Sequence, residues 1–241
     1  MTTQEQVTRI ADAFRQGLQD ILKRKLHGAV IYGAAAFPDA VPTGDVDFHV
    51  ILTEPLTAGE RAALEALHED LGRRFPPLGV DMDGYYLLLE DARRPTPPRS
   101  QMWARAVDTS WALHREHIRA GRCIVLHGPD PSGIYPPATW PELEAALFSE
   151  LDYVERSLDD YPDFCILNLC RLIYSFETRD VVVSKAAAAA WAIDALPAWT
   201  RAIDLARTTY PMRATPEERQ VLQAEAGRFL PFAQAWIEAC R

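Results

Sequence analysis

The hydrophobic pattern of this chain of 241 residues changes part-way along its length, and that change limits the folds it can adopt. Over the first ~90 residues, segments with helical periodicity alternate with short apolar runs typical of buried strands. After a proline-rich connection at residues 92–100 and one more short strand, almost every segment has helical periodicity. We therefore predict an α/β domain with a mixed sheet over residues 1–138, followed by an all-α helical bundle over residues 139–241.

The same pattern gives the individual elements. Thr57, with Glu60 three residues later, is expected to cap the helix that follows it. Five stretches between Trp140 and Cys240 have the periodicity of helices. In the first half we predict helices over Gln4–Lys25, Thr57–Arg74 and Thr109–Ala120, and strands over Ala29–Tyr32, Val46–Leu52, Val80–Leu89 and the segment CIVLH.

Composition makes several functional classes less favourable. The net charge of −9 disfavours a nucleic-acid partner, because such proteins usually present a basic patch. It suits a neutral or cationic ligand, although acidity for solubility alone is commoner. The apolar stretches are too short to span a membrane, and the opening segment MTTQEQVTRIADAF is polar. The four cysteines show no metal-site spacing, so we expect reduced cytosolic thiols. We also expect a cytoplasmic monomer without a membrane partner.

The segment YGAAAFPDAVPTGDVDFHVIL carries two aspartates, Asp45 and Asp47, into a predicted strand. Residues two apart in a strand face the same way, so their carboxylates repel each other unless a cation lies between them. Asp81 and Asp83 repeat the pattern near the next predicted strand. A bare Asp-x-Asp is more often a turn feature. Combined with the turn at Gly33, the set is more specific and predicts a two-metal phosphoryl-transfer site.

The same segment resembles the nucleotidyltransferase motif of Gly-Ser, a loop, and Ser/Gly-Asp-x-Asp. The pieces LNLCRLIYSFET, AAAAWAIDALP and AIDLARTTY resemble the helical domain of aminoglycoside adenylyltransferases, the type that modifies streptomycin and spectinomycin. MDGYYLLLED and CIVLHGPDP are similar to the family's third-strand segment and interdomain turn. The resemblance extends from about His27 to Tyr210.

The resemblance implies a site for each step of nucleotidyl transfer. Asp45 and Asp47, together with Asp83, would hold two Mg²⁺ ions on the triphosphate of ATP. Asp83 would also be the catalytic base, with Asp81 as the alternative if the strand register differs. The residues implied at the nucleotide are Gly33, Arg171, Lys185 and Tyr210, with Ala34 and Gly44 at the matching loop positions. Thr43 is added as a candidate phosphate donor because it directly precedes Gly44 in the loop.

Two departures from the family pattern bear on activity. Ala34 and Gly44 stand where the family has or often has serine, so two hydroxyl donors to phosphate are missing. A hydrogen bond to a charged group contributes ~1.5–3 kcal/mol, so nucleotide affinity or rate could fall by orders of magnitude unless Thr43 compensates. A nucleotidyltransferase fold that lost activity and serves as a ligand-binding or regulatory module is therefore an alternative.

Acidic residues near the end of one predicted helix form the predicted substrate site. Carboxylates are poorly placed at a helix C-terminus, and a polycationic aminoglycoside would be held well by acids and aromatic faces. A solvated acidic surface is the equally weighted alternative. The residues concerned are Glu155, Asp159, Asp160 and Asp163, with Tyr153 and Tyr161 among them.

Histidines are weaker candidates for metal ligands than the aspartates of the predicted strands. His49 shares a strand face with the aspartates, but magnesium prefers oxygen ligands, so we interpret it as a second-layer or core residue. His114 and His117 are expected on a solvated helix face.

The carboxylate pattern and the resemblance together imply transfer of AMP from Mg-ATP to a hydroxyl of a small molecule, an aminoglycoside antibiotic, which would confer resistance. Transfer to RNA ends is disfavoured by the acidic charge.

Overall fold

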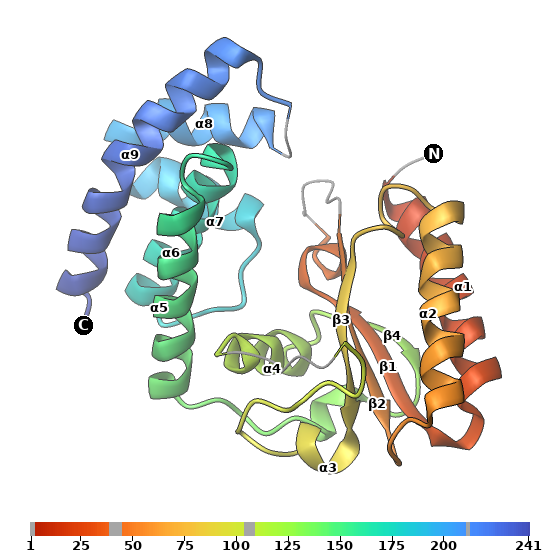
Figure 1. Ribbon diagram of the computed structural model, residues 1–241. Helices are drawn as coiled ribbons and strands as arrows, with labels where there is room; N and C mark the ends of the chain where they lie inside the picture. The colour runs from red at the N-terminus through yellow and green to blue at the C-terminus, as the bar shows by residue number, and fades with distance from the viewer. Residues whose placement is uncertain (1–2, 39–44, 104–108, 211–212) are drawn as a thin grey trace. The chain divides into compact units, whose positions relative to one another are not determined.

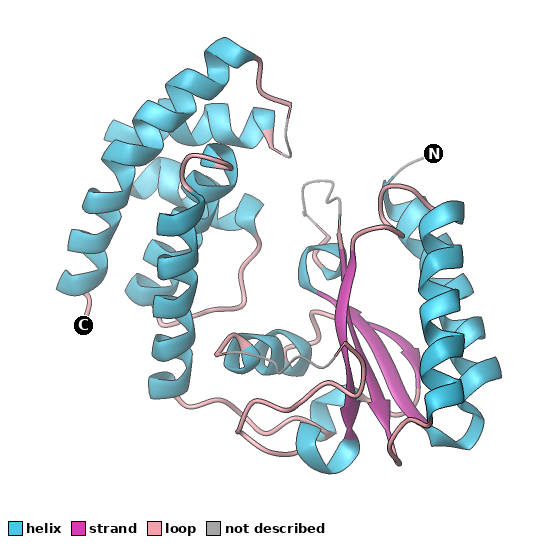
Figure 2. Cartoon of the chain, viewed as in Figure 1, coloured by secondary structure: helices cyan, strands magenta, loops and turns pink. Residues whose placement is uncertain are grey.

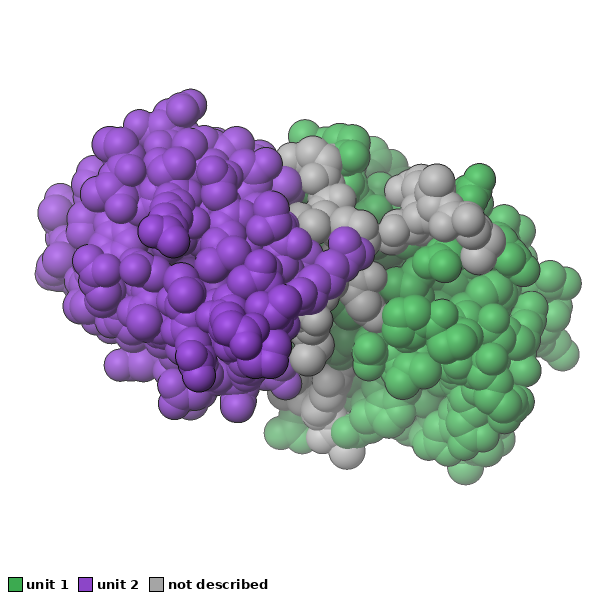
Figure 3. Space-filling model, turned by 90° about the horizontal axis from the view of Figure 1, so that it is seen from above, with its two compact units in different colours: residues 1–38, 42–142 green, residues 39–41, 143–241 purple. Residues whose placement is uncertain are grey.

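The computed structural model describes residues 3–38, 45–103, 109–210 and 213–241. The described residues divide into two compact units, one ending at residue 142 and the other formed by residues 143–241 (Figure 3). The predicted domain boundary after residue 138 stays a prediction.

The first unit is built on a four-stranded sheet with the strand order β3-β2-β1-β4. β1 pairs antiparallel with both β2 and β4, whereas β2 and β3 are parallel, so the sheet is mixed as predicted. Parallel neighbours need a crossover, and helix α2 (Ala58–Arg74) supplies it between β2 and β3. The strands are β1 Leu26–Tyr32, β2 Val46–Leu52, β3 Met82–Leu88 and β4 Ile124–His127.

Helices α1 (Thr3–Leu22) and α2 cover one face of this sheet (Figures 1 and 2). Alternate residues of β2 point toward them: Val46, Phe48 and Val50 are fully buried, as predicted for this face. The ring of Phe48 lies 4.9 Å from that of Phe14 in α1, in an edge-to-face arrangement. The side chains on the opposite face of β2 are therefore left for other contacts.

The start of α2 follows the sequence prediction. Thr57 Oγ1 accepts the N–H of Glu60 at 3.3 Å, and Glu60 Oε2 accepts the N–H of Thr57 at 2.7 Å. Lys25 Nζ donates to the same carboxylate at 2.9 Å, and this bond, followed by the one from Thr57, lowers the pKa of Glu60 to about 2. The capping box therefore ties α2 to the segment before β1.

The opposite face of the sheet packs against α3 (Leu89–Ala92), α4 (Trp111–Arg119) and the turn near Tyr135. Arg115 in α4 is fully buried and donates from Nη2 to Glu142 Oε1 at 2.6 Å. His117 is only 7% exposed. The expectation that this helix presents a solvated histidine face is therefore wrong, because α4 packs against the sheet on one side and holds residues 136–142 on the other.

The second unit is helical. Its central helix, α6 (Pro162–Thr178), contacts α7, α8 and α9 and buries most of its side chains. Cys165 and Cys170 lie among them as buried thiols, as expected for small apolar residues. None of the helices in the described part of the chain combines the length and apolar character needed to cross a bilayer. The other long helices are α5 Trp140–Ser157, which begins just before the unit boundary, α7 Lys185–Ala195, α8 Thr200–Thr209 and α9 Pro216–Ala239.

Candidate active site

The parallel register of β2 and β3 places two of the predicted carboxylates side by side. Asp47 is paired with Asp83, and Val46 donates its N–H to the carbonyl of Asp81 at 3.0 Å, which fixes this register where both strands begin. Residues paired in register point to the same face of the sheet. Asp47 is half-buried and Asp83 is exposed, so the pair lies at an accessible end of the sheet.

The third predicted carboxylate, Asp45, is exposed and immediately precedes β2. Within the described ranges, no group of three histidine, cysteine, aspartate or glutamate side chains is arranged to hold a metal ion. The structure therefore shows a carboxylate pair, Asp47 and Asp83, and the convergence of three carboxylates on two ions stays a prediction. Magnesium takes one or two protein carboxylates and completes its shell with water and phosphate oxygens, so the pair fits this ion.

Gly33 lies directly against the Asp47 carboxylate. It follows β1, whose last residue Tyr32 is paired with Asp47, and its φ of +68° lies in the left-handed region. A Cβ at this position would overlap Asp47 Oδ2. The left-handed backbone therefore favours glycine here, and a side chain at this position would have to displace the Asp47 carboxylate. Ala34 follows in the same short helical turn, whereas Thr43 and Gly44 lie outside the described residues.

Gly84 is a second glycine at this site, and sequence analysis missed it. It follows Asp83 and is paired with Phe48 across the two parallel strands. A Cβ there would overlap the carbonyl oxygen of Phe48. Glycine therefore lets β3 approach β2 next to the carboxylate pair, and an isolated glycine within a strand pattern was the available signal.

An aromatic and imidazole cluster continues along the same sheet face. His49 is fully buried, and its Nδ1 lies 3.1 Å from Tyr135 Oη. Burial, followed by the charge of His114, lowers the pKa of His49 well below its ordinary value, so this imidazole is neutral. His49 is therefore a core residue, the interpretation favoured from the sequence. Trp111 packs against it with ring centroids 5.6 Å apart.

Tyr32 joins this cluster to the carboxylates. Its hydroxyl lies 3.2 Å from Nδ1 of His114, whose Nε2 lies 3.0 Å from Ser110 Oγ. Burial raises the pKa of Tyr32 well above its ordinary value, and the negative charge of Asp47 raises it further. Tyr32 is therefore a neutral phenol beside the acidic pair. His114 has a structural partner that its surface-like sequence context did not reveal.

In the helical unit, two of the predicted nucleotide residues come together. Lys185, the first residue of α7, donates from Nζ to Tyr210 Oη at 3.3 Å, and Tyr210 caps the end of α8. Arg171 lies on α6, where its Nη1 donates to Asn168 Oδ1 at 3.3 Å. The structure thus joins Lys185 and Tyr210 into one polar group and places Arg171 on the central helix of the same unit.

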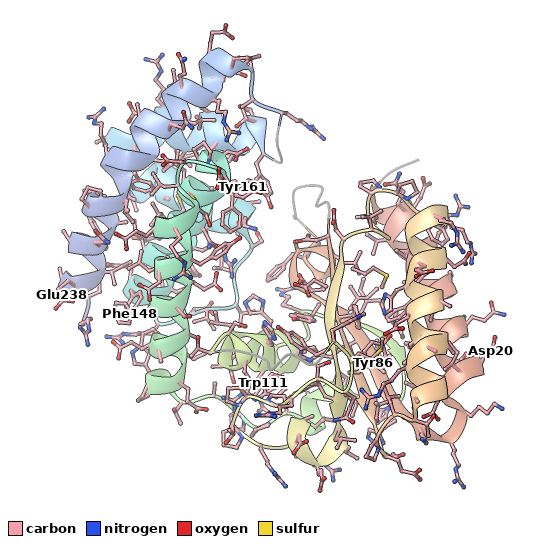
Figure 4. All side chains as sticks on the ribbon, in the orientation of Figure 1. Asp20, Tyr86, Trp111, Phe148, Tyr161 and Glu238 are labelled. Carbon is pink, nitrogen blue, oxygen red and sulfur yellow. The ribbon has the colours of Figure 1, made fainter. Side chains whose placement is uncertain are left out.

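The four predicted substrate acids differ in their surroundings. Asp163, at the start of α6, is only 6% exposed and accepts the N–H of Phe164 through Oδ1 at 2.8 Å. Its Oδ2 is buried with no hydrogen-bond partner among the described residues. Asp160, Tyr161 and Asp163 line a pocket of about 80 Å³ together with Arg219. Tyr161 lies at the start of α6 (Figure 4).

The other two substrate acids do not line this pocket. Glu155 is exposed on α5, and Asp159 is exposed in the turn that follows. Arg219 Nη2 donates to the backbone carbonyls of Asp159 and Asp160 at 3.1 and 2.7 Å, which fixes the turn.

Comparison with known proteins agrees with this architecture. Residues 136–235 match the family described as the aminoglycoside adenylyltransferase C-terminal domain. The resemblance to aminoglycoside adenylyltransferases is thereby confirmed. This helical domain matches over most of the second unit, and the match supports a nucleotidyltransferase enzyme. No curated protein matches the sequence.

A solved structure extends the likeness to the whole chain. The crystal structure of spectinomycin adenyltransferase AAD(9) from Enterococcus faecialis with ATP and spectinomycin is similar, with a TM-score of 0.73 at 18% sequence identity. The similarity covers 97% of this chain and 100% of that one. The predicted fold class, a mixed-sheet α/β nucleotidyltransferase fold followed by a helical region, is confirmed.

Proposed function

We propose that the protein is an enzyme that transfers AMP from Mg-ATP to a hydroxyl group of an aminoglycoside antibiotic. The observation that carries the proposal is the pairing of Asp47 with Asp83 on parallel strands beside Gly33, in a fold similar to that of a spectinomycin adenyltransferase. Two adjacent carboxylates at an accessible sheet end are suited to a metal-bound triphosphate.

Magnesium is the proposed cofactor, with Asp45, Asp47 and Asp83 as its protein ligands. Bound there, it would neutralise the triphosphate and stabilise the departing pyrophosphate. The predicted number of two ions remains part of the proposal. Gly33 supports it, because a side chain there would overlap the Asp47 carboxylate that is proposed to hold the ion.

Asp83 is the proposed catalytic base. Its exposed carboxylate lies beside Asp47, where it can accept the proton of the acceptor hydroxyl as the oxygen attacks the α-phosphorus. The observed register supports Asp83 over Asp81, because Asp81 lies one pleat farther from Asp47. Backbone groups at Gly33, Ala34, Thr43 and Gly44 and the side chains of Arg171, Lys185 and Tyr210 are the proposed contacts to ATP.

The proposed acceptor is cationic. Asp163 supports this, because a buried carboxylate oxygen without a donor is stabilised when a ligand supplies an ammonium or guanidinium group. Glu155, Asp159 and Asp160 would add negative charge nearby. Since the similar structure contains ATP and spectinomycin, spectinomycin and streptomycin are the first acceptors to test.

Pyrophosphate release in the presence of Mg-ATP and each aminoglycoside tests the proposal. We expect release with at least one drug. Asp83→Asn should lower kcat by about 100-fold or more, the usual size of a general-base contribution, and Asp81→Asn should retain most activity. If Asp81→Asn is the more damaged variant, Asp81 is the base instead.

The alternative function is a ligand-binding module that lost activity with the hydroxyls absent at Ala34 and Gly44. Calorimetric binding of Mg-ATP without pyrophosphate release for any acceptor would favour it. Growth of cells expressing the protein on a panel of aminoglycosides identifies the acceptor class directly, because resistance appears only to drugs that are modified.

A further inference from the structure

Phe164 is a residue of the helical unit to which neither the sequence motif nor the family match assigns a role. It lies in the first turn of α6, directly after Asp163. Lys185 Nζ lies 4.8 Å from the centroid of its ring and 5.2 Å from the centroid of the Tyr210 ring. One ammonium group thus contacts two aromatic side chains from separate elements.

The Phe164 ring is itself fixed by packing. Tyr153 of α5 meets it edge-to-face, with ring centroids 5.9 Å apart and an interplanar angle of 87°. Because three helices and the end of α8 contribute to this group, the position of the ammonium is set by tertiary packing rather than by the flexible lysine stem alone.

Lys185 occupies a position where a cation needs stabilising contacts from aromatic rings. It is the first residue of α7, and Ser184 caps that helix by accepting the N–H of Ala187 at 2.9 Å. The positive end of the helix dipole disfavours an ammonium group there, and aromatic faces offset this cost. Lys185 is half-buried, so the ammonium group stays within reach of a ligand.

We infer that Phe164 is a positioning residue for nucleotide binding. It holds the ammonium of Lys185 against Tyr210, in the place where Lys185 contacts a phosphate oxygen of Mg-ATP. The inference rests on the proposed function, since it assigns the anion that Lys185 binds. A lysine without this ring would sample more rotamers and would lose part of its affinity for phosphate.

The test compares Phe164→Leu with the wild type in calorimetric titrations of Mg-ATP without acceptor. Leucine keeps an apolar side chain but removes the aromatic face, so Kd for Mg-ATP should rise about 3- to 30-fold. In steady-state assays KM for ATP should rise by a similar factor, while KM for the aminoglycoside stays unchanged. Phe164→Tyr should restore wild-type affinity.

Phe148→Leu is the matched control. Phe148 lies on α5 of the same unit (Figure 4). It is also half-buried and also carries a cation over its ring, with the guanidinium of Arg241 5.2 Å from the ring centroid. This variant should bind Mg-ATP as the wild type does. A double-mutant cycle completes the design: in a Lys185→Met background, Phe164→Leu should have no further effect on Kd.

The possible results of these titrations show whether the inference or the proposed function is wrong. An unchanged Kd for Phe164→Leu, or an effect that persists undiminished in the Lys185→Met background, overturns the inference while the proposed function stands. A wild-type protein that binds no Mg-ATP overturns the proposed function itself. Thermal unfolding of each variant shows whether a loss of affinity comes from loss of the fold.

Discussion

At the scale of single residues, the candidate site depends on contacts that span two strands. The sequence identified Gly33, Asp47 and Asp83 by type and order. It could not show that a side chain at Gly33 would overlap Asp47 Oδ2, because that approach is set by the antiparallel pairing of β1 and β2. The role of glycine here is therefore a matter of tertiary distance as much as of backbone freedom.

Gly33→Ala should abolish most activity through this overlap. Displacing the Asp47 carboxylate by about an ångström is expected to lower kcat/KM by about 100-fold. The left-handed φ adds a cost of about 1–2 kcal/mol to folding. Pyrophosphate release and chemical denaturation measure the two effects separately.

Gly121→Ala is the matched control for that prediction. Gly121 also has a left-handed φ, +75°, but among the described residues nothing lies within 4 Å of a Cβ placed there. It should lose similar stability and keep its activity. Equal loss of activity in both variants would mean that backbone strain, not the carboxylate, explains the requirement for glycine.

The buried ion pair of Arg115 gives a second residue-scale prediction. The Arg115 side chain is fully buried, whereas that of Glu142 is 32% exposed. Glu142→Gln leaves an uncompensated buried cation and should destabilise the protein by about 3–5 kcal/mol. Arg115→Met leaves a carboxylate that water can reach, so it should cost less. Denaturant unfolding of both variants tests the order, and the reverse order would contradict it.

At the scale of elements, local pattern and capping chemistry predicted more than packing did. β2 has the predicted bounds, Val46–Leu52, and Thr57 caps α2 as expected, because both depend on residues close in sequence. The burial of α4 was missed, because its arginines and histidines have partners in β1 and in residues 136–142 that local periodicity does not reveal. The pairing of Asp47 with Asp83 likewise depends on which strands become neighbours.

The packing of α2 on the sheet predicts a pH dependence of stability. His68 of α2 lies among aromatic rings with its Nε2 2.9 Å from Tyr86 Oη, and burial lowers its pKa to about 4. In the unfolded chain the imidazole of His68 takes up a proton near pH 6.5, whereas in the folded protein it does so only near pH 4. The stabilisation is therefore complete above pH 6.5 and is lost as pH falls toward 4, by about 1.4 kcal/mol per pH unit.

Urea unfolding between pH 7.5 and 4.5 measures this slope. His49 contributes in the same direction, so the difference between the wild type and His68→Leu isolates His68. The variant should lose less stability on acidification. Parallel pH profiles for the two proteins would show that His68 is not buried as a neutral group.

At the scale of the whole molecule, charge is the property that bears most on substrate choice. The chain carries a net charge of −9, and the proposed acceptor is a polycation while the proposed donor is an anion. Long-range attraction raises the encounter rate with a cation and is screened by salt. The net charge follows directly from the composition, although composition alone does not distinguish a functional charge from one that serves solubility.

Raising the ionic strength from about 0.05 to 0.5 M should therefore lower kcat/KM for the aminoglycoside by several-fold, because the Debye length falls well below 10 Å over this range. The kcat/KM for Mg-ATP should change less or rise. Steady-state rates with each substrate varied in turn measure both trends. Equal salt sensitivity for the two substrates would argue against electrostatic selection of a cationic acceptor.

The alternation of side chains along β2 has a consequence for how this protein can change over generations. Val46, Phe48 and Val50 hold the core on one face, and Asp47 and His49 serve the other. An insertion or deletion of one residue in this strand would exchange the two sets, exposing the core residues and burying the carboxylate together. A shift in register at β2 would therefore disturb the core and the candidate site at the same time, whereas substitution of Asp47 alone would remove the carboxylate and leave the core face intact.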